Sequence, residues 1–411
     1  MHYLDTILLK SNPYLKDAFS TDQYDTLKER IAYIYNISDT TLIVKEFCKV
    51  YVNLIKEIHQ SLHTYNKPLC DFIESEGNKK LIWGDCYDVL KDMKSESVHC
   101  IVTSPPYYNV RDYSQWDNID SYLSDMENIL SECYRVLDNH RVMILNVGDI
   151  FDNDHRDTKA GWGKRRIPLG AYFINLFEKV GFTFIDDIIW DKGEVQSERH
   201  KNGDRPYPFY QYPMNCYEHI LVFHKHRIDE YRYPCPICGS LNVNANSYSE
   251  KGLMTWECKN SGCFTRSESG RGKRFSAKTY FTQDEDRNIE SEIDDEYIYS
   301  WRRDIRRFNP VIKITSKGVN RLGHTAPYPK DIPEFATRMF TYKGEVVLDP
   351  FSGLGTSLRT ACYLGRVGIG IERDESIKEN VYEFVGKSEL FSENDLSEYS
   401  YKNETTNHKL I

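Results

Sequence analysis

The chain has 411 residues, of which 40% are hydrophobic, enough for the cores of two or three domains. Its net charge of −9 does not indicate nucleic-acid binding, although residues 199–278 hold thirteen Lys/Arg against seven Asp/Glu, a local balance of +6. The absence of a long apolar stretch, of a secretory signal pattern at the start and of an even, clustered cysteine framework predicts a cytoplasmic protein.

The predicted elements change character along the chain. Residues 1–78 contain apolar residues at helical spacing and are expected to form a helical N-terminal extension. From residue 79, short apolar strands alternate with helices as far as residue 225, and the alternation returns over 323–390. Such alternation predicts an α/β fold with a doubly wound, mostly parallel sheet. The expected strands are 80–85, 98–102, 141–149, 182–192, 216–225, 346–349 and 367–372, and the expected helices are 120–137, 169–181 and one beginning near Thr356.

Two segments fall outside this rhythm. Residues 226–322 combine a cysteine group, Gly/Ser-rich pieces and charge runs, and we expect an insertion with its own architecture. Residues 391–411 are polar and are expected to form a frayed tail.

A glycine-rich turn follows the predicted strand of "VVLDPFSGLGTS" (346–357). Gly353 and Gly355 allow the backbone to approach a ligand closely, and the helix beginning at Thr356 offers free N–H groups. Asp349, at the end of the strand, is a candidate to accept hydrogen bonds from a ligand amine or hydroxyl.

The next strand, "VGIGIERD", ends at Glu372, where an acid is placed to bind a ribose diol. A nicotinamide-binding fingerprint would need glycine at position 358, which is leucine here. The short F-x-G-x-G loop beginning at Phe351 suits a nucleoside without a pyrophosphate, which favours S-adenosylmethionine; a purely structural glycine turn is the alternative.

An unusual corner ends the strand at 98–102. "TSPPYYNVRDY" (103–113) places two prolines and two tyrosines there, and proline cannot donate to a β-ladder. With the glycine loop, Ser104-Pro105-Pro106-Tyr107 resembles the S-P-P-Y motif of amino-methyltransferases that modify exocyclic nitrogens of DNA bases. The order of corner, insertion and glycine loop is similar to the permuted beta group of that family.

The resemblance covers residues 80–390 apart from 226–320, and it implies a Rossmann-like methyltransferase fold. It implies that Ser104 Oγ and the Pro105 carbonyl accept hydrogen bonds from the target amine, and that Tyr107 stacks on a flipped base. "GD" at Gly84-Asp85 resembles the acid that binds the adenine amine of S-adenosylmethionine. The implied cofactor residues are Asp85, Asp349, Phe351, Gly353, Gly355, Thr356 and Glu372.

The implied function is site-specific methylation of duplex DNA in a bacterial or phage restriction–modification system, with a separate cognate endonuclease as a partner. Serine before Pro-Pro favours cytosine N4 over adenine N6, which stays open as the alternative. An inactive DNA-binding protein on a methyltransferase scaffold is a second alternative, and RNA or protein amide methylation is a third. Enzymes of this third kind usually have the glycine loop before the corner in the sequence, the reverse of the order here.

Four cysteines form two close pairs, "CPIC" (235–238) and "CKNSGC" (258–263). This spacing predicts a closed, structural zinc site of the zinc-ribbon kind, formed by Cys235, Cys238, Cys258 and Cys263. Reduced free cysteines or a disulfide are the alternatives.

The same region is basic and aromatic, and by resemblance it is the target-recognition region, which would contact double-stranded DNA. The candidate DNA-binding residues are Arg271, Lys273, Arg274, Arg302, Arg303, Arg306 and Arg307.

Overall fold

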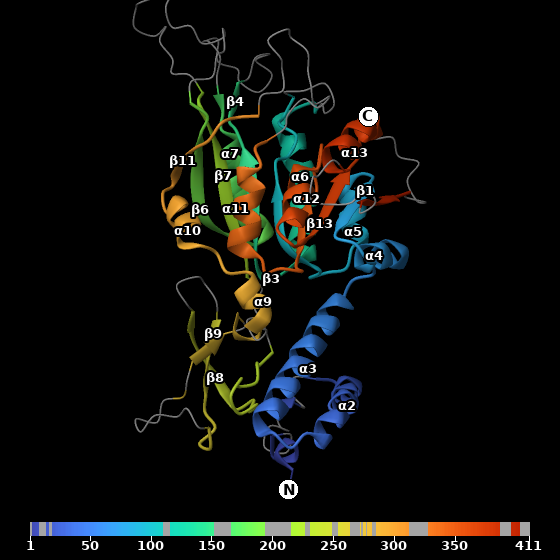
Figure 1. Cartoon of the computed structure of the whole chain (residues 1–411), viewed down its shortest axis with the longest axis vertical. Coiled ribbons are helices and arrows are strands. Elements are labelled where there is room, and N and C mark those ends of the chain that lie inside the picture. Colours follow the sequence, from blue (N-terminus) through green and yellow to red (C-terminus); the bar gives the residue numbers. More distant parts are fainter. Residues whose placement is uncertain are drawn as a thin grey trace, which may run out of the picture. The chain divides into compact units, whose positions relative to one another are not determined.

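A computed structural model describes residues 2–7, 14–15, 19–109, 116–151, 166–193, 215–226, 231–248, 254–263, 272, 274–276, 278–281, 285–311, 328–386 and 396–402. The chain divides into two compact units (Figure 1). The sheet unit comprises Tyr65–Lys225 and Ser291–Ile411, and the cysteine unit comprises Met1–Thr64 and His226–Glu290.

The sheet unit is built on a nine-stranded sheet in the order β11-β6-β7-β3-β2-β12-β13-β1-β14. β7 pairs antiparallel with both of its neighbours, and the other strand pairs of this sheet are parallel. The predicted α/β fold with a mostly parallel sheet is confirmed. The strands are β1 (Lys79–Trp83), β2 (Val98–Thr103), β3 (Leu137–Val147), β6 (Phe182–Asp191), β7 (Tyr217–Lys225), β11 (Ile305–Arg307), β12 (Val346–Asp349), β13 (Val367–Glu372) and β14 (Leu396–Ser400).

Helices cover both faces of this sheet (Figure 1). Apolar residues of α5 (Cys86–Asp92), α6 (Ile119–Val136) and α7 (Leu169–Val180) pack with alternate strand residues on one face. On the other face lie α11 (Asp331–Phe340), α12 (Thr356–Tyr363) and α13 (Lys378–Gly386). The unit also contains α4 (Lys67–Glu74), α10 (Asp295–Ser300), η3 (Glu375–Ile377) and the small β4 (Ile150–Phe151)–β5 (Arg166–Ile167) pair.

Helix α6 shows why these segments fold as they do. Asn118 caps its N-terminus and accepts a hydrogen bond from the Ser121 N–H at 2.9 Å, which satisfies one otherwise unpaired donor. Tyr122, Met126 and Leu130 recur every four residues and are buried against the sheet. Burial of such side chains stabilises the fold by about 1.5–3 kcal/mol each.

The cysteine unit combines the N-terminal helices with much of the insertion. It contains α2 (Thr21–Arg30), η1 (Ala32–Asn36), α3 (Thr40–Gln60), α8 (Lys278–Phe281) and α9 (Glu285–Glu290), with a three-stranded sheet of β8 (Val243–Tyr248), β9 (Met254–Cys258) and β10 (Arg274–Ser276). The two units meet in the sequence at residues 64/65 and 290/291, whereas the sequence analysis placed the changes at 78 and 322. Residues 65–78 and 291–311 belong to the sheet unit, where β11 extends the large sheet.

The predicted frayed tail is partly wrong. Residues 396–400 form β14, which pairs with β1 at the edge of the sheet. Glu398 accepts a hydrogen bond from Trp83 Nε1 at 3.1 Å, and Tyr401 Oη donates to Asp92 at 2.7 Å. The composition of this segment does not predict a strand. It forms β14 because β1 offers a free edge and because these polar contacts hold it there.

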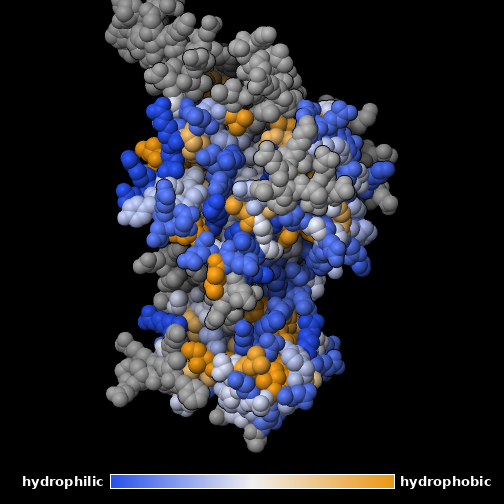
Figure 2. Space-filling view, viewed as in Figure 1, coloured by the Kyte–Doolittle hydropathy of each residue, from blue (hydrophilic) through white to orange (hydrophobic). Residues whose placement is uncertain are grey.

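The visible face of the sheet unit is mostly hydrophilic, with separated apolar residues (Figure 2). Across the described residues, no helix is both long and apolar enough to cross a membrane.

Candidate functional site

The S-P-P-Y corner follows β2 directly, at the middle of the sheet between β3 and β12. Pro105 is buried and Ser104 is half-buried. Tyr122 Oη donates a hydrogen bond to the Pro106 carbonyl at 3.0 Å, which ties the corner to α6. Among the described residues no hydrogen bond is donated to the Pro105 carbonyl, and its role as an acceptor for the target amine stays a prediction.

Tyr107 is half-buried, and its hydroxyl lies in a polar network. The hydroxyl donates to Glu218 Oε2 at 3.0 Å and accepts from the Gly148 N–H at 2.9 Å. Burial raises the pKa of Tyr107 well above its ordinary value, the charge of Glu218 adds to the rise, and a hydrogen bond with Ser104 opposes it. Tyr107 therefore keeps its proton and is anchored by its hydroxyl; stacking of its ring on a base stays a prediction.

The glycine loop leads from β12 into α12 as predicted. Gly353 has φ 51° and Gly355 has φ 84°, conformations that favour glycine. A Cβ on Gly355 would lie 2.7 Å from Val385 Cγ2, so the loop also packs too closely there for a side chain. Thr356 begins α12 and Phe351 is half-buried against the core, so both lie where the sequence places them.

Asp349, at the end of β12, is held by four hydrogen bonds within the protein. It is fully buried, and its Oδ1 accepts from the Thr103 hydroxyl at 2.6 Å and the Phe351 N–H at 3.1 Å. Its Oδ2 accepts from the Ser357 hydroxyl at 2.5 Å and from Tyr328 Oη at 3.2 Å. Burial raises the pKa of Asp349, and these four donors oppose the rise. Because both oxygens accept hydrogen bonds from the protein, Asp349 braces the loop against β2; its contact with the cofactor stays a prediction.

Two further carboxylates lie at neighbouring strand ends. Glu372 ends β13, where its Oε2 accepts from the Gly353 N–H at 2.9 Å and its Oε1 from the Asp374 N–H at 2.8 Å. Burial raises the pKa of Glu372, and these backbone donors oppose the rise. Asp85 follows β1, is exposed and caps α5 through the Tyr87 N–H at 2.9 Å. The predicted acids thus lie in a row beside the glycine loop.

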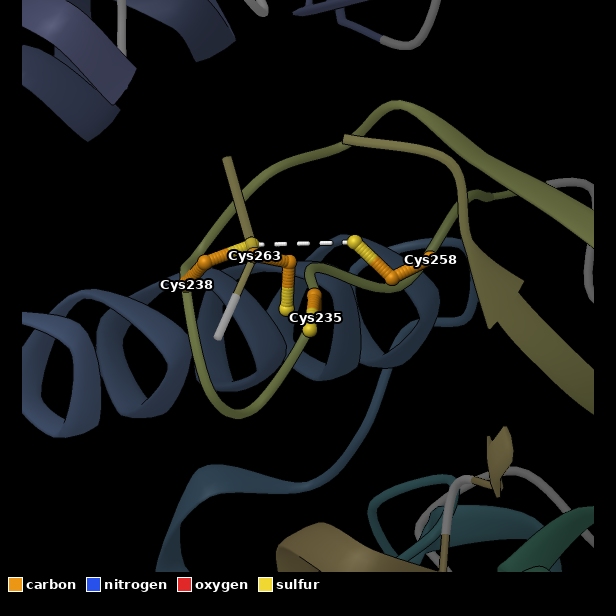
Figure 3. Close-up of side chains that lie close together, drawn as sticks. All are labelled: Cys235, Cys238, Cys258 and Cys263. Carbon is orange, nitrogen blue, oxygen red and sulfur yellow. Dashed lines mark hydrogen bonds between the residues drawn. The ribbon is translucent and has the colours of Figure 1, made fainter. Parts of the chain in front are cut away.

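The four predicted metal ligands converge in the cysteine unit (Figure 3). All four are buried, and their sulfur atoms lie within 4.8 Å of one another. The Sγ atoms of Cys238 and Cys258 are 3.7 Å apart. This is close to the ~3.8 Å between two sulfur atoms that bind one zinc ion tetrahedrally with Zn–S bonds of ~2.3 Å. Asn260 Nδ2 also donates to Cys238 Sγ at 3.6 Å. The donor set and its spacing fit a four-thiolate zinc site.

N-terminal helices hold the loop that carries these cysteines. Tyr3 Oη donates to the Cys238 carbonyl at 3.1 Å, and Tyr51 Oη to the Arg232 carbonyl at 2.9 Å. Cys48 Sγ donates to the Cys235 carbonyl at 3.8 Å. The N-terminal segment and the cysteine loop are therefore one packed structure.

The predicted DNA-binding residues are divided between the two units. Arg306 lies with its guanidinium 4.8 Å above the Trp301 ring and donates to the Ser300 carbonyl. These contacts commit Arg306 to the protein, so a DNA-binding role for it is not favoured. Arg274 is exposed on β10 of the cysteine unit, Arg302, Arg303 and Arg307 are exposed on the sheet unit, and Arg271 and Lys273 lie outside the described residues.

Glu218 is a site residue that the sequence analysis missed. Its Oε1 accepts from Lys192 Nζ at 2.9 Å, and its Oε2 accepts from Asn146 Nδ2 at 3.2 Å as well as from Tyr107. The sequence feature that could have indicated Glu218 as a site residue is its position directly before the apolar run of "EHILVF".

The fold and the site together define a methyltransferase of the DNA-modifying class. A sequence profile of the N6/N4 methyltransferase family, described as DNA methylase, matches residues 98–383. The chain therefore belongs to this DNA methylase family.

Individual relatives agree with this assignment. The chain is 37% identical over 350 residues to the type II beta methyltransferase M.BslI of Bacillus sp. (strain NEB-606), covering 83% of this chain but 31% of that protein. It is 26% identical to the type II methyltransferase M.MjaI of Methanocaldococcus jannaschii, covering 76% and 93% of the two chains. The structure of a putative DNA modification methylase from Thermus thermophilus shares the fold, with a TM-score of 0.50, 22% identity and coverage of 79% and 100%.

Proposed function

We propose that the chain transfers a methyl group from S-adenosylmethionine to the exocyclic N4 amine of a cytosine flipped out of duplex DNA. The observation that carries this proposal is the pairing of β2 with β12, which brings the S-P-P-Y corner and the glycine loop together at adjacent strand ends. A target amine and a methyl donor bound there would be neighbours.

S-adenosylmethionine supplies an electrophilic methyl group when bound. The chain's task is to orient an amine whose lone pair is delocalised into the base. Ser104 Oγ and the Pro105 carbonyl accept its N–H hydrogen bonds, which favours a pyramidal nitrogen with its lone pair directed at the methyl group. Because proline fixes the direction of the carbonyl, little reorganisation is needed at the moment of transfer.

The cofactor is held by the row of strand ends. Gly353, Gly355 and the N-terminus of α12 allow close approach of the backbone, and Glu372 and Asp85 bind the ribose diol and the adenine amine. Phe351 and Thr356 flank this site. Asp349 contributes by fixing the loop, as its four internal hydrogen bonds indicate.

The choice of cytosine rests on Ser104, since a neutral hydroxyl in this position is typical of N4 methylation and a carboxylate or amide of N6 methylation. M.BslI and M.MjaI are named as type II methyltransferases, which supports a role in a restriction–modification system with a separate endonuclease. We place the enzyme in the cytoplasm, where its DNA substrate lies.

The cysteine unit is proposed to bind one structural zinc ion through Cys235, Cys238, Cys258 and Cys263. Four thiolates close the coordination shell, so the ion would order the loop and take no part in methyl transfer. Arg274, Arg302, Arg303 and Arg307 are exposed cations available to DNA phosphates.

The test uses the full chain, tritiated S-adenosylmethionine and unmethylated DNA of mixed sequence. Label should enter the DNA, and mass spectrometry of the digested nucleosides should show N4-methylcytosine. If N6-methyladenine is the only modified nucleoside, the substrate is adenine and the assignment to cytosine is wrong. Folded protein that transfers no label would refute the proposal.

A further inference from the structure

Glu218 lies at the carboxyl edge of the sheet because β7 runs antiparallel to its neighbours and begins there. Its side chain is 17% exposed. It accepts three hydrogen bonds from side chains, those of Tyr107 (3.0 Å), Lys192 (2.9 Å) and Asn146 (3.2 Å). A Cβ on Gly148 would lie 2.9 Å from Glu218 Cγ, so glycine at position 148 makes room for this arrangement.

The hydroxyl of Tyr107 has one hydrogen, and it donates that hydrogen to Glu218 Oε2 at 3.0 Å. The Tyr107 oxygen is then left as an acceptor, and it accepts from the Gly148 N–H at 2.9 Å. Glu218 and the Gly148 N–H together fix the Tyr107 hydroxyl, and with it the Tyr107 ring at the S-P-P-Y corner.

We infer that Glu218 is a positioning residue for methyl transfer: it holds the Tyr107 hydroxyl and so orients the Tyr107 ring at the corner where the flipped base is proposed to stack. This inference rests on the function proposed above. Without the carboxylate, the Tyr107 hydroxyl loses the acceptor at 3.0 Å that fixes it, and the ring can leave the orientation that suits the base.

Glu218→Gln is the informative substitution because it keeps the shape of the side chain. Its single carbonyl oxygen must serve three donors, and its amide nitrogen cannot accept the hydrogen bond that Tyr107 donates to the carboxylate. We expect kcat on unmethylated DNA to fall about 10-fold to 100-fold, the range for outer-shell partners that orient catalytic groups. The affinity for S-adenosylmethionine, measured by calorimetry, should not change.

Glu132→Gln provides the matched control. Glu132 is 21% exposed and pairs with Arg135 at 2.7 Å on α6, away from the corner. It should show a similar change in Tm and an unchanged kcat. A loss of kcat confined to Glu218→Gln is not explained by lost stability.

A double-mutant cycle separates action through Tyr107 from an independent effect. If Glu218 acts through the Tyr107 hydroxyl, Tyr107→Phe combined with Glu218→Gln should be no slower than Tyr107→Phe alone. Losses that multiply, or a Glu218→Gln enzyme with the wild-type kcat, would overturn the inference while leaving the proposed function intact. A wild-type enzyme without methyl transfer would instead refute the function.

Discussion

The Thr103 hydroxyl donates a 2.6 Å hydrogen bond to Asp349 Oδ1, although the two residues are 246 positions apart. Thr103 precedes the S-P-P-Y corner and Asp349 precedes the glycine loop. Both are fully buried, so the bond is shielded from water. It connects the part of the site proposed to hold the base to the part proposed to hold the methyl donor.

Replacing Thr103 with valine should therefore disturb both parts. The change keeps the shape but removes a donor to a buried carboxylate, with a cost of about 1–3 kcal/mol. We expect lower stability in urea unfolding and weaker binding of S-adenosylmethionine by calorimetry. Thr103→Ser, which keeps the hydroxyl, should retain the binding; equal binding by Thr103→Val and wild type would contradict the coupling.

Gly355→Ala should damage the glycine loop. At φ 84° an alanine is strained by about 1–2 kcal/mol, and its Cβ would also lie 2.7 Å from Val385 Cγ2. Gly344→Ala is the control, because Gly344 has φ 78° and nothing within 4 Å of the added Cβ. Thermal unfolding should show a larger loss for Gly355→Ala, and only this variant should lose S-adenosylmethionine binding. An equal loss of thermal stability in the two variants would mean that Val385 moves away from the added Cβ without an energetic cost.

Loss of the proposed zinc site should loosen the N-terminal helices as well as the cysteine loop. Tyr3, Cys48 and Tyr51 bond to the backbone of that loop, so its order supports theirs. In Cys235→Ser/Cys238→Ser we expect the loss of about one equivalent of zinc and faster hydrogen exchange in α3.

Cys216→Ser is the control for that experiment, because Cys216 lies outside the four-cysteine cluster. It should retain zinc and the exchange rate of α3. A double mutant with an unchanged metal content would exclude the proposed site.

Exposed arginines should contribute to the salt dependence of DNA binding. Arg303→Ala and Arg307→Ala are each expected to lower the slope of log K against log salt by about 0.9 if each side chain neutralises one phosphate. Arg306→Ala should lower stability instead, since it removes the contact with Trp301. Fluorescence anisotropy over a salt series measures the slope, and identical slopes for all variants would remove these residues from the DNA interface.

His219 should make stability depend on pH. Burial lowers its pKa, but the hydrogen bond and charge of Asp187, with the charges of Asp149 and Glu218, outweigh burial and raise it. A raised pKa means that the stabilisation is fully present below the unfolded value of about 6.5 and is lost as the pH rises through the folded value. The Tm difference between wild type and His219→Gln should therefore be larger at acidic than at alkaline pH; an equal difference would refute this.

Much of the sheet unit was predictable from sequence because buried parallel strands are continuous apolar runs and the two motifs mark their ends. The corner, the glycine loop, Glu372 and the cysteine pairs lie where the local patterns indicate. The position of Asp349 at a strand end was also predictable, but its four internal donors come from β2, the loop, α12 and the segment before α11, and no local pattern reports them.

Other features depend on partners distant in the chain. Glu218 and Tyr107 are 111 residues apart, and their contact requires the reversed strand β7. The cysteine loop packs against α3 through the hydrogen bond from Cys48 to Cys235, two residues that are 187 positions apart in the sequence. β14 forms because β1 offers a free edge, not because "LSEYS" is a strong strand former.

β7 runs antiparallel to its neighbours, and its two ends lie at opposite edges of the sheet. Glu218 stands at its start, beside the corner, whereas Lys225 ends it about 24 Å away at ~3.4 Å per residue. The second segment of the cysteine unit begins at the next residue of the chain. Substitutions at the Lys225 end of the strand can therefore alter where the chain leaves the sheet without changing the hydrogen bond between Glu218 and Tyr107.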